Sequence, residues 1–491
     1  MAYLLALDAG TTSNRAIVFT ADGTPVASAS IALTQHFPAD GWVEHDGQDI
    51  IAGLLDSARD AIQKADISPA EIAGVGLTNQ RETTLLWDRA TSELLHPAIV
   101  WQDRRTAELC EALKQRGLEG EFTEKTGLLL DPYFSGTKLR WLLDQVPDGQ
   151  ARAERGELAF GTVDTWVAWV LSKGSHHIID ATNASRTLLF NVDDQCWDTS
   201  LLSHLNIPAA VLPTVVDSAG TLAPIDASFF GVPLTLSGIA GDQHAALVGQ
   251  ACIEPGMVKS TYGTGCFMMV NTGAQRLKSE HRLLSTLAYR LNGVPTYALE
   301  GAIFNVGTSI QWLRDGLAVL EDASESAAMA AAAKDDEVFL VPAFTGMGAP
   351  WWDANARGLV CGLTRDTGRN ELVRAALDAC AYQTADLLEA MSADGQACAA
   401  LRVDGGMVVN DWLCQRLADL TGARIDRPSV TETTALGAAL LAAIGAGVYP
   451  SLEAATTHWS RERCFNPEMA SEVRSARHQA WQVAVRRALT A

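Results

Sequence analysis

The sequence predicts an α/β fold made of two related domains, and three observations support this prediction. Short apolar runs of strand-like composition are interleaved with stretches whose apolar residues recur at helical spacing. The order strand, turn, strand, turn, strand, helix occurs at the start of the chain and again about 250 residues later. The length of 491 residues allows about two to four domains of roughly 100–200 residues. We therefore expect one domain at residues 1–250 and a second at 251–491, with the boundary near residues 250–255.

The first unit opens with three predicted strands, at residues 3–8, 15–19 and 25–33. A Gly/Thr/Ser turn at residues 10–14 separates the first two, and Asp22-Gly23 is a hairpin signal before the third. Beyond Gly41 the period changes, and residues 50–64 carry apolar side chains at helical spacing with a charged outer face. The unit is therefore predicted to be a three-stranded meander followed by a helix.

The second unit repeats this order with four predicted strands, at residues 257–262, 266–271, 284–291 and 296–300. Residues 263–265, Gly-Thr-Gly, form its first turn, and Asn292-Gly293 is a strong two-residue hairpin signal. Residues 304–320 have the pattern of an amphipathic helix. The Ala-rich segment 324–336 is predicted to be a solvent-facing helix without a function of its own.

The composition favours a cytoplasmic protein that acts on small molecules. Lys and Arg number 37 against 58 Asp and Glu, and the net charge of −21 disfavours nucleic acid and anionic membranes as partners. No signal peptide is recognisable, because the first basic residue is Arg15. The longest apolar stretch, 435–448, is shorter than the ~20 residues of a membrane span, so we expect a buried helix that packs through small residues. The 9 cysteines are scattered without a CxxC pair, which fits a reducing compartment.

The two Gly/Thr turns are candidate phosphate-binding sites. In such a turn successive backbone N–H groups point into one concavity, glycine permits close approach, and Thr or Ser hydroxyls add donors. One such turn is equally the tip of an ordinary hairpin, but two at equivalent places in repeated units could clamp a polyphosphate from both sides of a cleft. Arg15, just beyond the first turn, is a candidate cation for the β- and γ-phosphates, or else a surface residue on a strand.

Two aspartates stand at the ends of predicted strands. Asp8 ends the first strand beside the first turn, where a carboxylate can hold Mg²⁺ directly or through water; its alternative role is to cap the turn. Asp242 lies between a predicted strand at residues 233–236 and a helix that begins at Ala245. It either caps that helix or projects into the cleft between the domains.

Polar segments follow three apolar runs, at residues 78–83, 101–105 and 131–134. They are either solvated loops or ligand sites at the carboxyl ends of strands in an open α/β sheet. Their Arg, Glu and Tyr side chains offer the donors and acceptors that a polyol needs, and Trp101 offers an apolar face for its carbon atoms. The Asp-Gly-Gly at residues 404–406 precedes a helical run at 410–420. This segment and Gly307 are candidates for close approach to a flat ring or a phosphate, or simply for tight packing.

With these residues in view, the chain resembles the FGGY family of carbohydrate kinases over nearly its whole length. Two motifs belong to the whole family, Asp8-x-Gly-Thr and Asp404-Gly-Gly406. Three are typical of its members that phosphorylate glycerol: Asn79-Gln-Arg-Glu-Thr83, Asp131-Pro-Tyr-Phe-Ser-Gly-Thr-Lys138 and Asn183-Ala-Ser-Arg186. Further matches are residues 99–105, 161–166, 241–243 and 261–267.

The resemblance implies an actin-like (ribonuclease H-like) ATPase fold with two duplicated domains around a central cleft. It implies ATP-dependent phosphorylation of glycerol to sn-glycerol 3-phosphate, the first step of glycerol catabolism, with ATP and Mg²⁺ as cofactors. Residues 1–250 would bind glycerol and carry the first phosphate hairpin and the catalytic aspartate, and residues 251–491 would carry the second hairpin and bind adenosine. Because relatives form dimers and tetramers, a homodimer or homotetramer is also implied.

The motifs also imply a role for each matching residue. Asp242 would be the general base that takes the proton of the attacking hydroxyl. The hydroxyls of glycerol would be bound by Arg81, Glu82, Tyr133, Asp242 and Gln243, and its carbon side would lie against Trp101 and Phe267. The phosphates would be bound by Thr11, Thr12, Ser13, Arg15 and Thr264. The nucleoside would lie along Gly307, Gln311, Gly406 and Asn410, and Asp8 would lie near Mg²⁺.

Three departures from the family pattern concern regulation and nucleotide affinity. Ala9 stands where glycerol-phosphorylating members commonly have Gln, so one side-chain hydrogen bond near the first turn is missing. Residues 226–236 lack the Gly-rich, Arg-bearing loop through which some relatives bind fructose 1,6-bisphosphate. Ser228 stands where relatives regulated by phosphorylation carry histidine.

Three other functions remain as alternatives at this stage. Another FGGY kinase, acting on a ketopentose or a longer polyol, would share the family motifs. An actin-like ATP switch that drives partner binding would need both turns but no aspartate beside a polyol pocket. A degenerate binding protein would have no need of intact Asp8 and Asp242.

Overall fold

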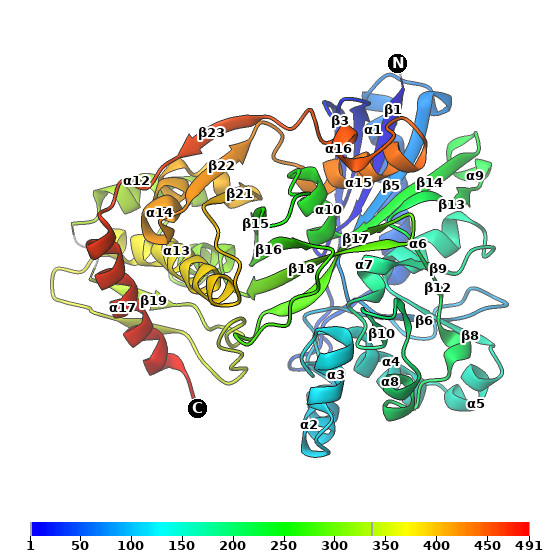
Figure 1. Ribbon diagram of the computed structural model, residues 1–491, viewed down its shortest axis with the longest axis horizontal. Helices are drawn as coiled ribbons and strands as arrows, with labels where there is room; N and C mark the ends of the chain where they lie inside the picture. Colours follow the sequence, from blue (N-terminus) through cyan, green and yellow to red (C-terminus); the bar gives the residue numbers. More distant parts are fainter. Residues whose placement is uncertain (1, 335–336, 491) are drawn as a thin grey trace.

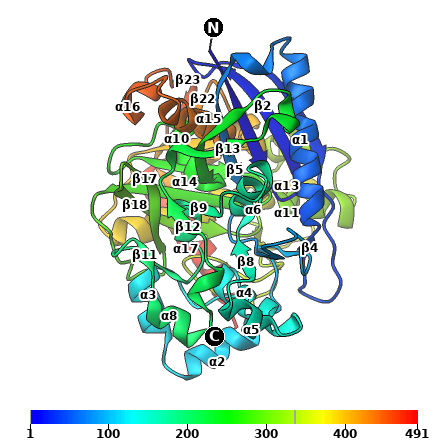
Figure 2. The same cartoon turned by 90° about the vertical axis from the view of Figure 1, so that its right-hand side faces the viewer.

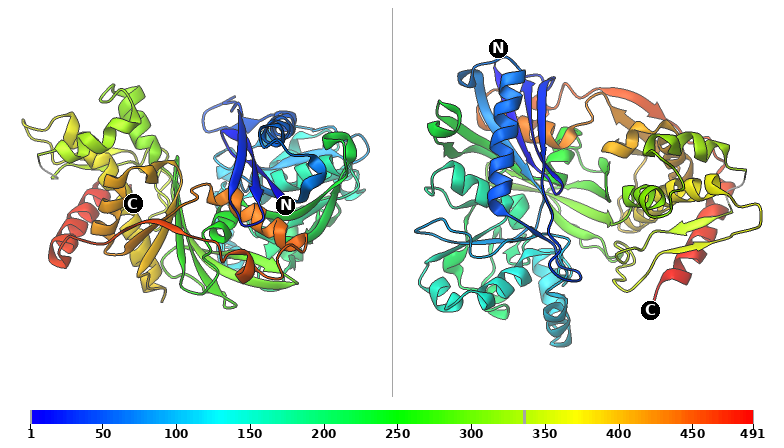
Figure 3. Two further views of the ribbon diagram at one scale, coloured as in Figure 1. Left: turned by 90° about the horizontal axis from the view of Figure 1, so that it is seen from above. Right: turned by 180° about the vertical axis from the view of Figure 1, so that it is seen from behind.

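The computed structural model describes residues 2–334 and 337–490, which form two lobes, each built on one mixed β-sheet (Figure 1). The first sheet lies in the lobe that holds the N-terminus, and the second lies in the lobe that holds the last helix. Seen from above, strands drawn in green lie between the two lobes (Figure 3). The fold is thus the predicted pair of α/β units around a central seam.

The first sheet has six strands in the order β13–β14–β5–β1–β2–β3. Their bounds are β1 Tyr3–Ala9, β2 Ser13–Thr20, β3 Pro25–Ala32, β5 Ile72–Asn79, β13 Ala219–Ile225 and β14 Leu234–Gly241. The central strands β14, β5 and β1 run parallel, and their register places Ala9 and Gly241 on either side of Asn79. The three carboxyl ends therefore lie at one level of one sheet edge, which is where open α/β sheets bind ligands.

Both faces of the first sheet are buried at its central strands β14, β5 and β1. Three helices cover it: α1 Gly47–Lys64, α6 Val163–Leu171 and α15 Thr433–Gly445. On β1, Leu5 and Leu7 belong to the core that includes residues of α1 and α6, whereas Leu4 and Ala6 belong to the core that includes α15. This alternation follows from the two-residue period of a strand. Helix α1, in blue, runs along the outside of the molecule (Figure 2).

Helix α15 returns from the second half of the chain and crosses α10 (Asp242–Gly249) backbone against backbone. A Cβ added at Gly437 would lie 1.7 Å from the carbonyl oxygen of Ala245, and one added at Gly249 would lie 1.9 Å from that of Thr433. Only glycine permits so close an approach. The prediction of a buried helix that packs through small residues is therefore confirmed.

The second sheet has seven strands in the order β17–β18–β16–β15–β21–β22–β23. Their bounds are β15 Val258–Tyr262, β16 Cys266–Gly273, β17 Leu284–Leu291, β18 Val294–Ile303, β21 Ala400–Asp404, β22 Arg424–Pro428 and β23 Arg461–Phe465. As in the first sheet, antiparallel strands at the start of the unit are joined to a parallel set, here β15, β21 and β22. The β17–β18 hairpin turns at Asn292 and Gly293, whose φ angles of 52° and 75° match the predicted two-residue turn.

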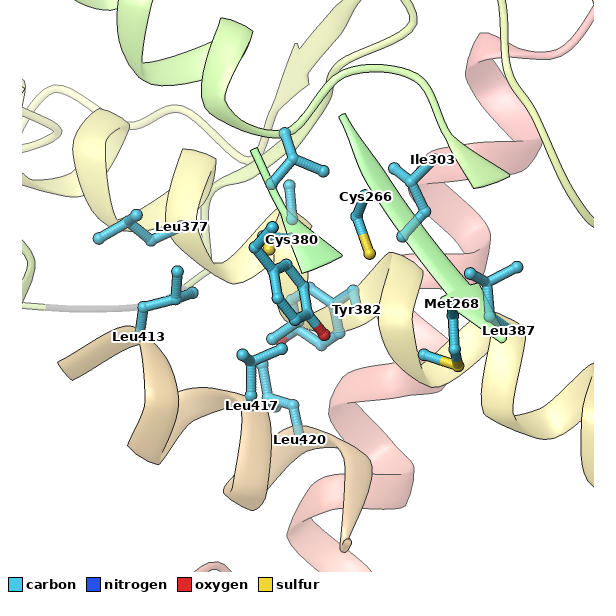
Figure 4. Packing of buried hydrophobic residues seen from close by; sticks show 14 of the residues in the cluster. Cys266, Met268, Ile303, Leu377, Cys380, Tyr382, Leu387, Leu413, Leu417 and Leu420 are labelled. Carbon is cyan, nitrogen blue, oxygen red and sulfur yellow. The ribbon is translucent and has the colours of Figure 1, made fainter. Parts of the chain in front are cut away.

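The core of the second lobe lies between its sheet and two helices, α13 Arg369–Ala393 and α14 Asp411–Thr421. Figure 4 shows that α14 contributes Leu413, Leu417 and Leu420 to this core, and that β16 contributes Cys266 and Met268. The intervals of four and three residues on α14 place its leucines on one helical face.

Shorter elements complete both lobes. Between β3 and β14 they are β4 Glu44–His45, η1 Pro69–Glu71, β6 Leu85–Asp88, β7 Ala98–Ile99, α2 Ala107–Gln115, α3 Glu119–Thr126, α4 Ser135–Gln145, α5 Gly149–Glu154, β8 Leu158–Gly161, β9 Ile178–Asp180, α7 Ala181–Ala184, β10 Phe190–Asn191, β11 Cys196–Trp197, α8 Thr199–His204, η2 Ala209–Val211, β12 Thr214–Val216 and α9 Ala227–Phe230. After β18 they are α11 Gly307–Gln311, η3 Trp312–Gly316, η4 Ala323–Glu325, α12 Ser326–Ala332, β19 Phe339–Val341, β20 Leu359–Cys361, η5 Gly406–Val409, α16 Leu452–Ala455 and α17 Ser471–Ala488.

The helix predicted over residues 304–320 is wrong in length. Only the five residues of α11 are α-helical, and the π-helical turn η3 follows them. The amide of Gly307 donates to the carbonyl of Gly263 at 3.1 Å, so the second turn fixes where α11 begins. The chain then leaves the helical path near Ala318, which has a φ of 51°. A tertiary hydrogen bond and a local reversal thus override the helical periodicity of the sequence.

All nine cysteines are free thiols. Within residues 2–334 and 337–490, none of the helices combines the length and the apolarity that a bilayer span requires.

Candidate active site

Side chains predicted for the site meet at the carboxyl edge of the first sheet. Asp8 is the last residue but one of β1, Arg81 follows β5, and Asp242 directly follows β14. From the second lobe, Phe267 on β16 contacts Trp101 with ring centroids 6.1 Å apart and planes at 77°. Residues from both halves of the chain therefore line one seam.

Hydrogen bonds within the first Gly/Thr turn and from neighbouring residues hold it in shape. Its Gly10 amide donates to the carbonyl of Ser13 at 3.0 Å, and Gln80 Nε2 donates to the carbonyl of Gly10 at 3.0 Å. The indole N–H of Trp101 donates to Thr11 Oγ1 at 2.9 Å. Three hydroxyl-bearing residues form the partly exposed tip: Thr11, Thr12 and Ser13. The turn is thus held in shape even though Ala9, which precedes it, is fully buried and has no polar side chain.

The second turn lies on the other side of the seam and is also closed by a hydrogen bond from its first glycine, here to the second residue along the chain. The Gly263 amide donates to the carbonyl of Gly265 at 2.9 Å, and Thr264 is exposed at the tip. Helix α11 approaches closely at Gly307, where an added Cβ would lie 2.6 Å from the Gly263 carbonyl oxygen. Glycine at this position therefore lets the helix start against the turn.

Asp242 presents its carboxylate at the seam. Its Oδ1 lies 3.2 Å from Arg81 Nε and accepts the backbone amide of Gln243 at 2.7 Å, while the side chain stays 30% exposed. Gly241 makes room for this contact, because a Cβ there would lie 2.7 Å from Arg81 Cγ. Desolvation raises the pKa of Asp242, and the charges of Arg81 and Lys259 oppose that rise. The carboxylate is therefore less acidic than usual and still reachable from the cleft.

Asp8 is a second half-buried carboxylate near Asp242. The pKa of Asp8 is raised to about 7: desolvation is the largest cause, the charge of Arg15 opposes it, and those of Asp242 and Glu432 act in the same direction as desolvation. Carboxylate oxygens without histidine or cysteine are the donors that suit a hard cation such as Mg²⁺. Asp8, with Asp242 nearby, could therefore hold a divalent cation beside the first turn.

Arg15 makes an ion pair with Glu432, the residue before α15. The two side chains are 34% and 49% exposed, respectively. An exposed pair of this kind contributes roughly 0–1 kcal/mol, so a phosphate could compete for the guanidinium at little cost.

A buried network of four charges supports the seam. Arg81 donates to both carboxylate oxygens of Glu300, at 2.5 and 3.0 Å, and Arg186 donates to Glu300 at 3.0 Å and to Glu82 at 2.6 Å. All four side chains are at most 2% exposed. The charges of Arg186 and Arg81 hold the pKa of Glu300 far below its usual range despite its burial, whereas desolvation raises the pKa of Glu82. Glu300 lies on β18, so a carboxylate of the second half holds an arginine of the first.

Glu82 has a backbone conformation that few side chains adopt. Its φ is 60°, and the amide of Thr83 donates to the carbonyl of Arg81 at 2.7 Å, which closes a γ-turn around Glu82. The Glu82 carbonyl accepts hydrogen bonds from the hydroxyls of Ser135 and Thr84 at 3.0 and 2.9 Å. Strain of this kind is typical of functional sites, because the surrounding structure must hold it.

An aromatic group forms an apolar wall next to these charges. Trp101 and Tyr133 meet edge to face at 5.7 Å, and the Arg81 guanidinium lies 5.7 Å from the centre of the Phe267 ring. Trp101, Tyr133 and Thr264 line a cavity of about 510 Å³ that opens at the seam. The combination of buried charges and an apolar wall can bind the hydroxyl and carbon sides of a polyol.

A second cavity, of about 560 Å³, lies in the second lobe beside the second turn. It brings together five residues predicted for the nucleotide: Thr264, Gly307, Gln311, Gly406 and Asn410. Nothing lies within 4 Å of a Cβ added at Gly406, so that backbone faces open space. Asn410 Oδ1 also caps α14 by accepting the amide of Leu413 at 3.1 Å. The cavity is large enough for a nucleoside.

Several residues of these sites were not predicted from the sequence. The Ala-rich segment, predicted to be a helix without function, contributes η4 and α12, and its Ser326 and Ala327 line the second cavity; its last two residues, Asp335 and Asp336, lie outside the described residues. Lys259 and Glu300 are single charges inside apolar strand sequences. That isolation is a usable signal, because a charge in a buried strand must find a partner.

Comparisons with known proteins agree with this arrangement. The N-terminal domain of the FGGY family of carbohydrate kinases matches residues 3–249, and its C-terminal domain matches residues 258–446. A curated glycerol kinase from Alcanivorax borkumensis is 57% identical over 99% of this chain and 98% of that protein, and glycerol kinase 1 from Pseudomonas aeruginosa is 56% identical over the same shares. Among solved structures, a glycerol kinase of Plasmodium falciparum with ADP has a TM-score of 0.91 and 31% identity, covering 100% of this chain and 99% of that one. A xylulose kinase from Lactobacillus acidophilus, 22% identical with a TM-score of 0.88 over 99% and 97% of the two chains, shares the fold. The chain belongs to the FGGY family of carbohydrate kinases.

Proposed function

We propose that this chain catalyses the ATP-dependent phosphorylation of glycerol to sn-glycerol 3-phosphate, the first step of glycerol catabolism. The observation that carries the proposal is the contact between Asp242 and Arg81 at 3.2 Å, at a seam that the two Gly/Thr turns border. A base, a polyol-binding charge and two phosphate turns are what a sugar-alcohol kinase needs in one place. The names of the curated relatives, more than half identical over nearly the whole chain, support the same substrate.

Glycerol binds where donors and acceptors alternate. Arg81 and Gln243 offer donors, while Glu82 and Asp242 offer acceptors, so each hydroxyl can both give and receive a hydrogen bond. Tyr133 adds a phenolic hydroxyl 3.4 Å from Arg81 Nη2. The carbon side of glycerol lies against two rings, those of Trp101 and Phe267.

ATP spans the seam, with its phosphates between the two turns and its nucleoside in the second cavity. Five side chains bind the phosphates in this proposal: Thr11, Thr12, Ser13, Arg15 and Thr264. Four residues of the second cavity lie along the nucleoside: Gly307, Gln311, Gly406 and Asn410. Residues 1–250 accordingly form the glycerol-binding domain with the catalytic aspartate, and residues 251–491 form the adenosine-binding domain.

Phosphoryl transfer relies on position and charge, because the transition state is loose. Asp242 accepts the proton of the attacking hydroxyl late in the transfer, a role worth about 10²–10⁴ in rate. Asp8, with Asp242 nearby, would hold Mg²⁺, which would supply positive charge to neutralise the phosphates. The aromatic wall excludes water, which would otherwise attack the phosphate instead of glycerol.

We further propose that the enzyme works in the cytoplasm as a homodimer or homotetramer. Nine free thiols suit a reducing compartment, where ATP is also available. Size-exclusion chromatography with light scattering measures the assembly state, and a monomer at micromolar concentration would contradict this part of the proposal.

The test is a coupled assay of ADP release with glycerol, xylulose, ribulose or erythritol, each with and without Mg²⁺. We expect turnover with glycerol that depends on Mg²⁺ and little turnover with the other three. Turnover mainly on a ketopentose would reassign the substrate within the family. ADP release that is unaffected by every polyol would instead favour an ATP-driven switch.

A further inference from the structure

Lys259 is a fully buried lysine at the seam between the lobes. It lies on β15 in the second sheet, and its side chain is 0% exposed. Its ammonium donates to the amide oxygen of Gln243, which belongs to α10 of the first half, and also to Thr261 Oγ1 at 3.1 Å and the carbonyl of Phe267 at 3.2 Å. An ammonium has three N–H donors, so each donor has an acceptor.

These contacts determine which way the Gln243 amide points. Lysine can only donate, so Gln243 must turn its oxygen toward Lys259 and its NH₂ group the other way. Gln243 Nε2 has no hydrogen-bond partner within the described parts of the chain, residues 2–334 and 337–490. The NH₂ group is thus left as a donor, directly after a carboxylate that faces the cleft.

The charge of Lys259 is more than packing requires. Burial penalises an ammonium and lowers the pKa of Lys259, although Asp404 and Asp242 offset part of this effect. An apolar side chain of similar volume would fill the space without that penalty. The three direct acceptors are neutral, and two of them belong to residues with a proposed place in the glycerol pocket, Gln243 and Phe267.

We infer that Lys259 is a positioning residue, which holds the Gln243 amide so that its NH₂ group donates to a hydroxyl oxygen of the substrate. Gln243 then donates where its neighbour Asp242 accepts, and this pair matches a hydroxyl, which does both. A carbonyl or ether oxygen would satisfy Gln243 but has no proton to donate to Asp242. The inference rests on the function proposed above and adds the reason why this edge of the pocket prefers an alcohol.

The first test is a double-mutant cycle with Lys259→Met and Gln243→Ala, measured as kcat/KM for glycerol. Each single variant should lose about tenfold, the value of one hydrogen bond, with the KM for ATP within about twofold of wild type. If Lys259 acts through Gln243, the double variant also loses about tenfold in kcat/KM, because either single change already removes the hydrogen bond from Gln243 to the substrate. A loss of about a hundredfold in the double variant would overturn the inference.

Two controls show that the cycle reports this contact. Lys259→Met combined with Gln311→Ala should be additive, because Gln311 lines the nucleotide cavity and shares no hydrogen bond with Lys259. Lys278→Met removes a lysine that is 61% exposed and should leave kcat/KM unchanged. Wild type is assayed in parallel, so a wild-type protein that does not phosphorylate glycerol refutes the proposed function itself, whatever the cycle shows.

A second comparison works even if Lys259→Met fails to fold. Gln243→Glu keeps an oxygen for Lys259 and loses the NH₂ donor, whereas Gln243→Met loses both. Both variants should lose glycerol kcat/KM by about the same tenfold factor, but only Gln243→Met should unfold at a lower temperature than wild type. If Gln243→Glu instead keeps wild-type kcat/KM, the amide oxygen faces the substrate and the inference is wrong.

Discussion

Replacing Asp8 by asparagine should stabilise the ligand-free protein and at the same time abolish phosphoryl transfer. The pKa of Asp8 is raised to about 7, mainly by desolvation; the charge of Arg15 opposes this rise, and those of Asp242 and Glu432 contribute to it. Asparagine has nearly the same shape and no charge, so it removes the cost of ionisation in the fold. It also lacks the charged oxygen that a divalent cation needs.

The size of the effect follows from the pKa difference. A carboxyl group with a pKa of about 7 in the fold and 3.8 when unfolded lowers the free energy of unfolding by about 4 kcal/mol above pH 7. Below pH 3.8 Asp8 is protonated in both the folded and the unfolded state, so ionisation costs no stability. As the pH rises from about 4 to about 7, the free energy of unfolding falls, and above pH 7 the full cost applies. At pH 5.5 the cost is about 2 kcal/mol. Solvent at this half-buried site screens part of it, so about 4 kcal/mol is the upper end of the expected range.

The assay is urea unfolding in EDTA at pH 5.5 and pH 8. Asp8→Asn should raise the free energy of unfolding by up to about 4 kcal/mol at pH 8 and by about half as much at pH 5.5. The control Asp56→Asn, at a side chain that is 60% exposed, should stay within about 0.5 kcal/mol of wild type at both pH values. A destabilised Asp8→Asn, or a change that is the same at both pH values, would refute the reasoning.

Three further predictions concern the base, the buried charges and the helix crossing. Asp242→Asn should lower kcat by about 10²–10⁴ with the glycerol KM within a few-fold, and near-normal turnover would contradict the assigned role. Glu300→Gln leaves two buried arginines short of a partner and should cost about 3–5 kcal/mol in urea unfolding; a cost below about 1 kcal/mol would show that the network contributes little. Gly437→Ala should lower the free energy of unfolding by more than about 3 kcal/mol, because the new Cβ would lie 1.7 Å from a backbone oxygen. The control Gly120→Ala on α3, where nothing lies within 4 Å of an added Cβ, should raise it by about 0.5–1 kcal/mol. Equal unfolding midpoints for these two variants would contradict the backbone contact.

The elements that the sequence predicts well are those set by local pattern. The meander of β1, β2 and β3 and the hairpin at Asn292-Gly293 follow from apolar runs and turn residues that are adjacent in the chain. The two Gly/Thr turns are equally local, so their positions and their repetition could be found without any structure. The resemblance to the FGGY family implied that Thr264 binds phosphate and that Gly307 and Asn410 lie along the nucleoside, and all three residues line one cavity.

Where tertiary contacts compete with the local sequence pattern, the predicted secondary structure is wrong or the function of the segment is not predicted. The helix expected over residues 304–320 begins only at Gly307, which bonds to the second turn, and the chain leaves the helical path near Ala318. The Ala-rich segment has strong helix propensity, and that part of its prediction is confirmed by α12. Its place beside a cavity depends on α13 and α14, which lie tens of residues further along the chain, and composition carries no trace of them.

The pairs at the seam are the hardest to predict, and the reason is physical. Arg81 and Glu300 are 219 positions apart. Glu300 stands out as a single charge in an apolar strand, but its sequence does not show that Arg81 is its partner. Lys259 and Gln243 are only 16 positions apart, but they lie on a strand of one sheet and a helix of the other half, so no helical or strand period relates them. The sequence therefore shows which segments hold candidate functional residues. The pairing of donors with acceptors depends on how the two halves of the protein pack together. For this reason the motifs proposed to bind the substrate could be recognised in advance, whereas the contacts that pair them with Lys259 and Glu300 of the second half could not.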